Sequence, residues 1–481
     1  MLQWERVVSM KMTRYVMCNI FRSLDKKTIR MILALAWPTM LEQLMQTAVQ
    51  YIDTAMVGSL GTNAMAAVGA TTTVGWLIGG MVSAWGVGFL SYIARACGAG
   101  DRDAAAKAAA QAVLVTAAMG LLFTGITLGL SGQIPVWMQV KEAIRPLASQ
   151  YFFILYTPML FRAATIIFGT VLRAAGDTKT PMKVGVFVNI INVVLNFLLI
   201  YPTRPLEVAG LSFTMPGAGL GIVGAAAASA IAVAVGGIYI TVVLWRHPML
   251  SPRGQRFRPD GEILRPTLRV AIPNMFQRFG TSLGYVAFAA MINALGEIAT
   301  SAHTVANTVE SLFYIPGYGM QTAAATLAGN AYGAKDPQRM KRLARMFIPI
   351  EVSLMVVSGT LLFLFAEPLV RLFSADEAVI VLGVTVLRMV AVSEPFYGFS
   401  IIVEGMMQGV GRTRLPFIFN VAGMWLVRIA GTWVCTTMLG LGLVSAWACM
   451  IAHNLLLFGL FLGCYIRGTW NPLQGMTPAE G

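Results

Sequence analysis

The chain has 481 residues, of which 57% are hydrophobic and only 12% are charged, with a mean hydropathy of +0.70. This composition excludes ordinary water-soluble domains of such length and favours a membrane protein with many spans. The net charge of +14 would fit a nucleic-acid-binding protein, so the positions of the basic residues decide between the two readings.

Apolar stretches long enough to cross a bilayer core of about 30 Å as helices follow one another along the whole chain. Twelve spans are predicted, at 31–57, 65–93, 106–130, 149–172, 182–202, 219–245, 267–294, 303–332, 343–366, 381–408, 416–438 and 441–466. The alternating segments of about ten residues that form membrane β-barrels are absent. Helices satisfy their own backbone hydrogen bonds in lipid, so we predict an all-α membrane protein.

The 35 lysines and arginines are divided unequally between alternate loops. With the N-terminus inside, most of them face one side, and only Lys141, Arg145, Arg204 and Arg371 fall on the other. The positive-inside rule then places both termini of a multi-pass membrane protein in the cytoplasm. The basic excess indicates topology, and no nucleic-acid partner is predicted.

Residues 1–30 and the cysteines give little information about function. Residues 1–30 are predicted to be a cytoplasmic N-terminal segment, either an interfacial helix or a poorly ordered tail, because they lack the apolar core and cleavage site of a signal peptide. The five cysteines show no CxxC spacing. Neither a disulfide nor a metal site is predicted.

One unit occurs twice in the chain, shifted by 235 residues, since Pro38 aligns with Pro273. Longer matches keep this spacing: Gly98-Ala99-x-Asp101 aligns with Gly333-Ala334-x-Asp336, and Gly176-x-Thr178-x-x-Pro181 aligns with Gly411-x-Thr413-x-x-Pro416. Each half holds six spans, an even number, so the two halves enter the membrane in the same orientation. Parallel repeats of this kind predict a substrate site between two lobes and alternating access to it.

The repeat divides the chain into an N-lobe at 31–245, a cytoplasmic linker at 246–266, a C-lobe at 267–466 and a cytoplasmic tail at 467–481. The proline-containing stretch from Tyr201 to Pro216, which the second half lacks, is predicted to be an external surface loop.

Three motifs carry a family resemblance. Pro38 is followed by Asp53 on the first span, and the motif Leu172-Arg173-Ala174-Ala175-Gly176-Asp177-Thr178-x-x-Pro181 follows the fourth span, while Met407-Gln408-Gly409-Val410-Gly411-Arg412-Thr413-x-x-Pro416 follows the tenth. Over about residues 30–466 the chain resembles the multidrug and toxic compound extrusion (MATE) family, and it is most similar to bacterial NorM-like members. The resemblance implies a V-shaped pair of six-helix lobes that exports cationic or amphiphilic compounds in exchange for protons or sodium ions.

The resemblance also implies residues for coupling and substrate binding. In the N-lobe these are Asp53 on the first span, Asn192 and Asn196 on the fifth, and Ser229 on the sixth. Family members carry Asp at the position of Asn196, so this lobe has one carboxylate fewer than the family pattern. In the C-lobe, Gln277 and Tyr397 lie near positions where some NorM-like members carry Glu and Asp.

Acidic residues at membrane depth are functional candidates, because a charge there costs at least a few kcal/mol unless it is paired or hydrated. Glu394, deep in the tenth span, is the preferred coupling residue of the C-lobe, although Arg388 or Arg428 could instead hold it permanently ionised. Glu310 is a candidate partner, or else a fixed partner of Arg278. Two further acids, Glu351 and Glu404, are expected to reach headgroup water near the cytoplasmic side.

Pro38 and Pro273 remove backbone hydrogen bonds at equivalent positions of the first helix of each lobe. We predict bends there that act as hinges, with static packing bends as the alternative.

The preferred function is secondary active efflux of a small organic substrate, by a monomer surrounded by membrane lipids. A flippase for lipid-linked oligosaccharides from the same superfamily is the alternative. The chain lacks the HExxH, GxSxG and GxxxxGK[ST] patterns, so we do not predict an enzyme. No cofactor is expected apart from the coupling ion, H⁺ or Na⁺.

Overall fold

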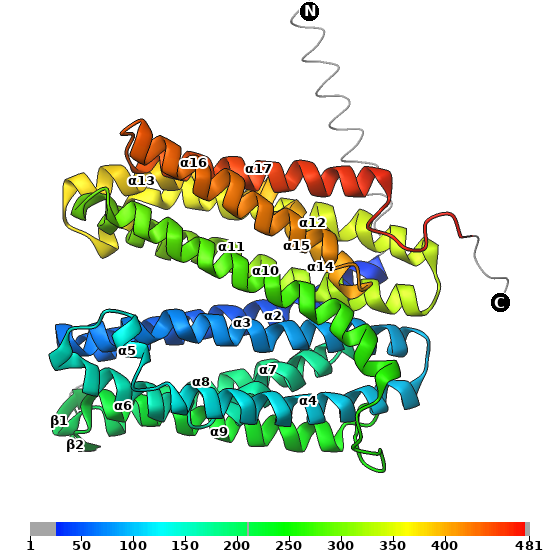
Figure 1. The fold of residues 1–481 in the computed structure, drawn as a ribbon, viewed down its shortest axis with the longest axis horizontal. Helices are drawn as coiled ribbons and strands as arrows, with labels where there is room; N and C mark the ends of the chain where they lie inside the picture. The colour runs from blue at the N-terminus through cyan, green and yellow to red at the C-terminus, as the bar shows by residue number, and fades with distance from the viewer. Residues whose placement is uncertain (1–25, 209–210, 477–481) are drawn as a thin grey trace, which may run out of the picture.

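A computed structural model describes residues 26–208 and 211–476, and the side chains of 70, 73 and 206–213 are left out. Two helical bundles lie side by side (Figure 1), one built from the first half of the chain and the other from the second half. The segment predicted at 1–30 lies outside the described residues apart from its last five, which already belong to the first helix.

The N-lobe consists of eight α-helices and one 3-10 turn in the described part of the chain. They are α2 (Lys26–Gly58), α3 (Thr62–Gly98), α4 (Arg102–Gly129), α5 (Ile134–Trp137), η1 (Glu142–Ile144), α6 (Arg145–Tyr156), α7 (Met159–Ala174), α8 (Lys179–Leu199) and α9 (Gly221–Arg246).

The C-lobe repeats this order with one helix widened by π-type turns. Its elements are α10 (Gly261–Asn293), α11 (Glu297–Gly333), α12 (Pro337–Phe373), α13 (Glu377–Ala391), α14 (Glu394–Gly409), α15 (Arg414–Ala422), η2 (Gly423–Ile429), α16 (Ala430–Trp433), η3 (Val434–Met438) and α17 (Leu443–Arg467).

Each of the twelve predicted spans corresponds to one helical segment within the described ranges. Seven single helices are long and apolar enough to cross a membrane, and two bent pairs bring this number to nine. The remaining three segments, α2, α10 and α11, are as long but more polar. At the boundary between the lobes, α10 and α11 pack against α3, and α11 also packs against α2. Protein therefore replaces lipid on part of the surface of these three segments.

The fourth helix of each lobe is bent at an equivalent place. The bend is 49° between α6 and α7 and 52° between α13 and α14. Pro158 caps α7 at the first bend, and Ser393 occupies the corresponding place before α14. The break between α13 and α14 therefore lies directly before Glu394, the first residue of α14.

The predicted all-α membrane fold of twelve helical segments is confirmed, and one connecting segment differs from the expectation. The stretch expected to be an external surface loop forms an antiparallel hairpin of β1 (Pro202–Val208) and β2 (Leu211–Ala218). The amide of Gly217 donates to the Thr203 hydroxyl at 3.1 Å, and a Cβ at Gly217 would lie 2.2 Å from the Tyr201 carbonyl oxygen. Paired strands satisfy backbone groups that a free loop would leave to solvent.

The segment between the lobes is shorter than predicted. Helix α10 begins at Gly261, inside the range expected to be linker, because the Asp260 side chain accepts a hydrogen bond from the Glu262 amide at 2.8 Å and caps it. Gln111 on α4 donates to the Arg258 carbonyl at 2.7 Å and accepts from the Asp260 amide at 3.1 Å. These two bonds attach the linker to the N-lobe.

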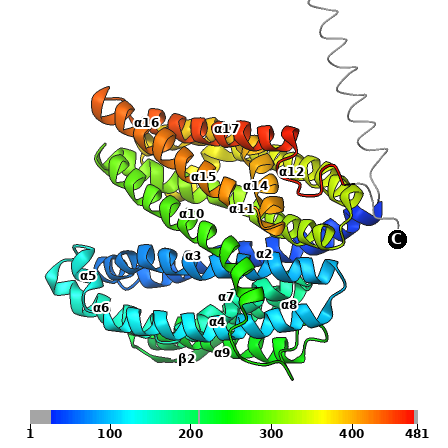
Figure 2. The same ribbon diagram turned by 45° about the vertical axis from the view of Figure 1, so that its right-hand side comes forward.

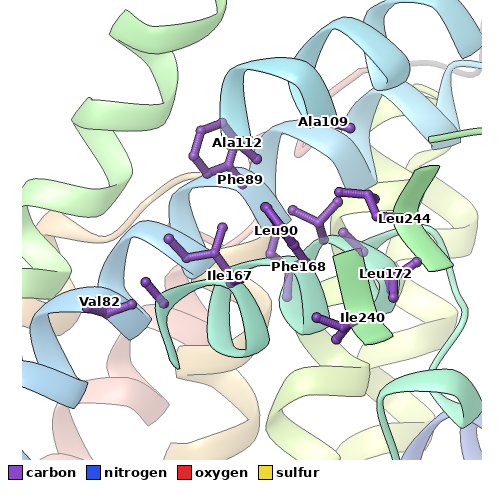
Figure 3. Packing of buried hydrophobic residues seen from close by; sticks show 14 of the residues in the cluster. Val82, Phe89, Leu90, Ala109, Ala112, Ile167, Phe168, Leu172, Ile240 and Leu244 are labelled. Atoms are coloured by element: carbon purple, nitrogen blue, oxygen red, sulfur yellow. The ribbon is translucent and has the colours of Figure 1, made fainter. Parts of the chain in front are cut away.

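The N-lobe core lies where α3, α4, α7 and α9 meet (Figure 3), and it combines large side chains with alanines. Phe89, Ile167 and Leu172 are fully buried there, opposite Ala109 and Ala112 on α4. Small residues allow the helices to approach closely, which gives helix packing in lipid its dispersion energy.

The lobes touch backbone to backbone at the C-terminal ends of α3 and α11. A Cβ at Gly98 would lie 2.0 Å from the Asn330 carbonyl oxygen, and one at Gly333 would lie 1.9 Å from the Arg95 carbonyl oxygen. These two glycines occupy equivalent positions in the repeat. Figure 2 shows the two bundles diverging from this end, in agreement with the predicted V shape.

A buried ion pair joins α2 to α7 inside the N-lobe. The Arg173 guanidinium donates through Nη2 to both carboxylate oxygens of Glu42, at 2.6 and 2.7 Å. The side chains are only 15% and 8% exposed, respectively. Removing one partner of such a pair leaves a buried charge without compensation.

We therefore expect Arg173→Gln to lower the free energy of unfolding by about 3–5 kcal/mol, measured by reversible denaturant titration in mixed micelles. Arg371→Gln is the control, because Arg371 pairs with the exposed Glu367 and Glu377 and should contribute at most about 1 kcal/mol. The double variant Glu42→Gln/Arg173→Gln should recover most of the loss. Equal effects of Arg173→Gln and Arg371→Gln would contradict this account of the pair.

Candidate functional site

A cavity of about 480 Å³ lies between the lobes, mostly on the C-lobe side. Its wall is built from α10, α11, α14, α15, η2 and α17, and α3 of the N-lobe contributes Gly75, Trp76, Gly79, Gly80 and Ser83. This volume is typical of sites for drug-sized molecules. The cavity lies at the lobe interface, where the parallel repeats predicted a substrate site.

Glu404 on α14 is held in the cavity wall by three amide side chains. Gln277 Nε2 and Gln408 Nε2 donate to Glu404 Oε1 at 2.7 and 3.0 Å, and Asn420 Nδ2 donates to Glu404 Oε2 at 3.3 Å. The expectation that Glu404 reaches headgroup water is therefore wrong, since only 9% of this residue is exposed and it lines the cavity.

The Glu404 site occupies the place that the Glu42–Arg173 pair occupies in the N-lobe. With the shift of 235 residues, Gln277 corresponds to Glu42 and Gln408 to Arg173. The acid and the third amide correspond to Gly169 and Gly185, and a Cβ at either of these glycines would lie in van der Waals range of Arg173 or Glu42. The buried carboxylate at this place is thus stabilised by an ion pair in the N-lobe and by neutral hydrogen-bond donors in the C-lobe.

The two predicted coupling acids of the C-lobe lie at different depths. Glu310 on α11 is 6% exposed and lines the cavity, while Glu394 is 2% exposed and lies behind its wall, without a hydrogen-bond partner for Oε2. Electrostatic interaction connects Glu394 to Glu310 and also to Glu351 on α12. Glu351 is 0% exposed and neither of its oxygens has a partner, so the expectation that it reaches headgroup water is wrong as well.

The arginines of the C-lobe do not neutralise these acids by direct contact. Arg278 Nε donates to Asn274 Oδ1 at 3.1 Å, and its electrostatic partner is Glu404 rather than Glu310. Arg388 lies over the ring of Phe363, with 5.6 Å between the guanidinium carbon and the ring centroid. Within the described residues neither Glu310 nor Glu394 forms an ion pair.

Gln277 and Tyr397 both line the cavity, as does a cluster of tyrosines around Tyr397. The hydroxyl oxygens of Tyr318 and Tyr397 lie 3.0 Å apart in a hydrogen bond, and the ring of Tyr314 packs edge-on against both rings. Aromatic faces of this kind bind apolar and cationic groups.

The predicted residues of the N-lobe come together on α2, α8 and α9. Asn196 Nδ2 donates to Asp53 Oδ1 at 2.6 Å, and the Asn192 amide lies between Asp53, Asn196 and Ser229, within 3.2 Å of Asn196 and 3.0 Å of Ser229. Asn192 and Asn196 are 6% and 1% exposed, whereas Asp53 is half-buried. These four residues form one hydrogen-bonded network, away from the cavity of the C-lobe.

The Asn192 amide joins Asp53 to Ser229. In the orientation that satisfies both ends of the amide, its nitrogen donates to Asp53 Oδ1 at 2.8 Å and its oxygen accepts from Ser229 Oγ at 3.0 Å. Amide donors from Asn192 and Asn196 therefore hold the Asp53 side chain.

Several residues of the cavity were missed from the sequence. Gln408 belongs to the motif after the tenth span but was given no role there, and no motif includes Asn420 or Tyr318. The repeat held one usable signal, because Gln277 and Glu404 replace Glu42 and Gly169, which shows that the charges of the two lobes are arranged differently.

The two halves of the chain match the same family model, MatE, at residues 38–198 and 273–434. A probable multidrug resistance protein NorM of Thermotoga maritima is 28% identical over 446 residues, which cover 93% of this chain and 94% of that protein. A probable multidrug resistance protein NorM of Chromobacterium violaceum is 24% identical over 460 residues, covering 91% and 93%.

A solved structure shares the fold. It is described as the outward-facing conformation of a multidrug resistance MATE family transporter, and it superimposes with a TM-score of 0.84 at 24% identity, covering 93% of this chain and 97% of that one. Because the family model covers most of both repeats, the chain belongs to the MatE family of multi-pass membrane transporters.

Proposed function

We propose that this chain exports small organic compounds with a cationic group in exchange for protons or sodium ions, by alternating access and without any other cofactor. The names of its relatives support drug efflux as the physiological role. The observation that carries the proposal is that Asp53, Glu310 and Glu394 are buried or half-buried carboxylates that form no ion pair within the described part of the chain. Such groups can exchange one counterion for another, whereas a carboxylate in a permanent ion pair cannot.

Asp53 is the exchanging group of the N-lobe in this proposal. Its side chain accepts from the neutral amides of Asn196 and Asn192, and within the described residues it forms no ion pair. The same network includes Asn192 and Asn196 on α8 and Ser229 on α9. A proton or cation bound at Asp53 would therefore change contacts between α2, α8 and α9.

Glu394 is the leading exchanging group of the C-lobe, with Glu310 as its partner. Glu310 lines the cavity, and Glu394, which interacts electrostatically with Glu310, is the first residue of α14 after the bend. A cationic substrate and the coupling ion then compete for the same negative charge. Competition of this kind couples their opposite movements, since each weakens binding of the other.

Alternating access requires the lobes to separate at the end where Gly98 and Gly333 contact the opposite backbones. Pro38 and Pro273 remain the proposed hinges. Both lie inside continuous helices, α2 and α10, and the Thr39 hydroxyl next to the first proline donates to the Gly319 carbonyl of the other lobe at 3.1 Å. A change at Pro38 would therefore reach the lobe interface directly.

The exchange proposal is tested with purified protein in liposomes that contain a fluorescent cationic dye. We expect Asp53→Asn and Glu394→Gln to insert normally, and gradient-driven efflux to fall by roughly tenfold or more in the variant that removes the coupling charge. Glu367→Gln is the control, because Glu367 is an exposed acid that pairs with Arg371 on the surface.

The pattern of loss identifies the lobe that couples. Loss in Asp53→Asn alone would assign the coupling site to the N-lobe, and loss in Glu394→Gln alone would assign it to the C-lobe. Wild-type rates with an unchanged dependence on the imposed gradient in both variants would refute the proposal.

We further propose that both termini and the segment 247–260 face the cytoplasm of a bacterial inner membrane. The unequal division of loop cations supports this orientation. In a chain whose native cysteines are replaced, Ala143→Cys should react with an impermeant maleimide added to intact cells, and Arg256→Cys should not. Both positions are exposed at loops of opposite ends. Labelling of Arg256→Cys but not of Ala143→Cys would show that the chain has the opposite orientation in the membrane.

A further inference from the structure

One wall of the interlobe cavity gathers buried hydrogen-bond donors that have no acceptor. Arg428 and His453 both line the cavity and are 4% and 5% exposed. Arg428 Nε and both ring nitrogens of His453 have no hydrogen-bond partner. Behind them, His303 Nδ1 and Trp447 Nε1 are also unpartnered. Buried donors without acceptors are unfavourable and uncommon in folded proteins, so this cluster calls for an explanation.

The backbone holds Arg428 rigidly in this wall. It lies in the π-helical turn η2, a rare conformation that occurs frequently at functional sites. Its guanidinium carbon lies 4.3 Å from the ring centroid of Phe288 and 4.9 Å from that of Tyr285. Gly423, in the same π-helical turn, leaves room for the His453 ring, since a Cβ there would lie 2.7 Å from His453 Cδ2.

The cluster is not neutralised from within the protein. Electrostatic interaction links Arg428 to Glu310, but in the part of the chain that the structure describes Arg428 forms no ion pair and no hydrogen bond. Arg278, the other arginine of the cavity, uses Nε to bind Asn274, and its side chain packs against Gly80 of the N-lobe, 3.5 Å from a Cβ built there. The nearby acid Glu404 already accepts from three amides.

We propose that Arg428 and His453, with Arg278 across the cavity, bind an anionic group of the transported molecule, namely a carboxylate or sulfonate. This inference rests on the proposed efflux function and narrows its substrate class. A guanidinium and an imidazole offer convergent donors to an anion, and charge-assisted hydrogen bonds of this kind are stronger than neutral ones. The preferred substrates are then zwitterions, with their cationic group near Glu310 and their anionic group at Arg428.

An aromatic zwitterion fits the remaining wall of the cavity. Trp76 from α3, Tyr285 from α10 and the tyrosines around Tyr397 present ring faces to the same space. Since both lobes contribute residues to the cavity, a molecule that bridges the two charged regions would contact α3 and the C-lobe at once.

Binding of two related dyes tests this inference. The probes are a rhodamine with a free carboxylate and its methyl ester, which share the ring system and the cationic charge. Binding to purified full-length protein in detergent is measured by fluorescence anisotropy. We expect the wild-type protein to bind the free carboxylate roughly tenfold more tightly than the ester, because a charge-assisted bond is lost in the ester. We expect Arg428→Gln to abolish this preference while affinity for the ester is retained.

The controls separate anion binding from packing. Arg388→Gln should keep the wild-type preference, because Arg388 is exposed and does not line the cavity. His453→Gln should reduce the preference if Arg428→Gln fails to fold. Equal affinity of the wild-type protein for the two dyes, or a full preference in Arg428→Gln, would overturn the anion site. If the protein exports the ester but shows no preference for the free carboxylate, the anion site is wrong and the proposed efflux function is retained. Binding of neither dye would contradict both the anion site and the efflux function.

Discussion

The cost of a charged or strongly polar side chain inside the membrane is the constraint on which this structure depends. For Glu42 this cost is offset by a fixed ion pair with Arg173, and for Glu404 it is offset by hydrogen bonds from three amides. Other groups at the same depth do not meet it from within the protein: Glu394, Arg428 and His453 retain atoms without any partner. We interpret the Glu42–Arg173 pair as framework, and the cavity group Arg428 with His453 and the acid Glu394 as places where substrate and ions bind.

The repeat explains how one fold came to hold two kinds of site. Equivalent helices form the interface, and equivalent glycines, Gly98 and Gly333, let the backbones touch across it. The equality ends with the charges, because the ion pair of the N-lobe is replaced by amides around Glu404 in the C-lobe. Glu404 and its amide partners line the cavity, so the polar groups of the C-lobe face the space between the lobes.

Much of this architecture could be predicted from the sequence, because an apolar stretch of some twenty residues identifies a helix that crosses the membrane. The network of Asp53, Asn192, Asn196 and Ser229 was also predicted, but only through the family resemblance. Two kinds of feature escaped. Residues 202–218 form a hairpin through strand pairing that the prolines concealed, and Glu351 and Glu404 are buried by neighbouring helices although their place along the spans suggested contact with water. Burial by another helix depends on lobe packing, which no single helix encodes.

Transport by wild-type protein in liposomes loaded with a cationic dye, with a proton gradient and a sodium gradient imposed separately, tests the central claim most directly. If unpaired carboxylates exchange a coupling ion for substrate, at least one gradient will drive the dye against its own concentration gradient, and an imposed dye gradient will move that ion in the opposite direction. Dye that only equilibrates across the membrane, whichever gradient is imposed, would show that the carboxylates do not couple the two movements.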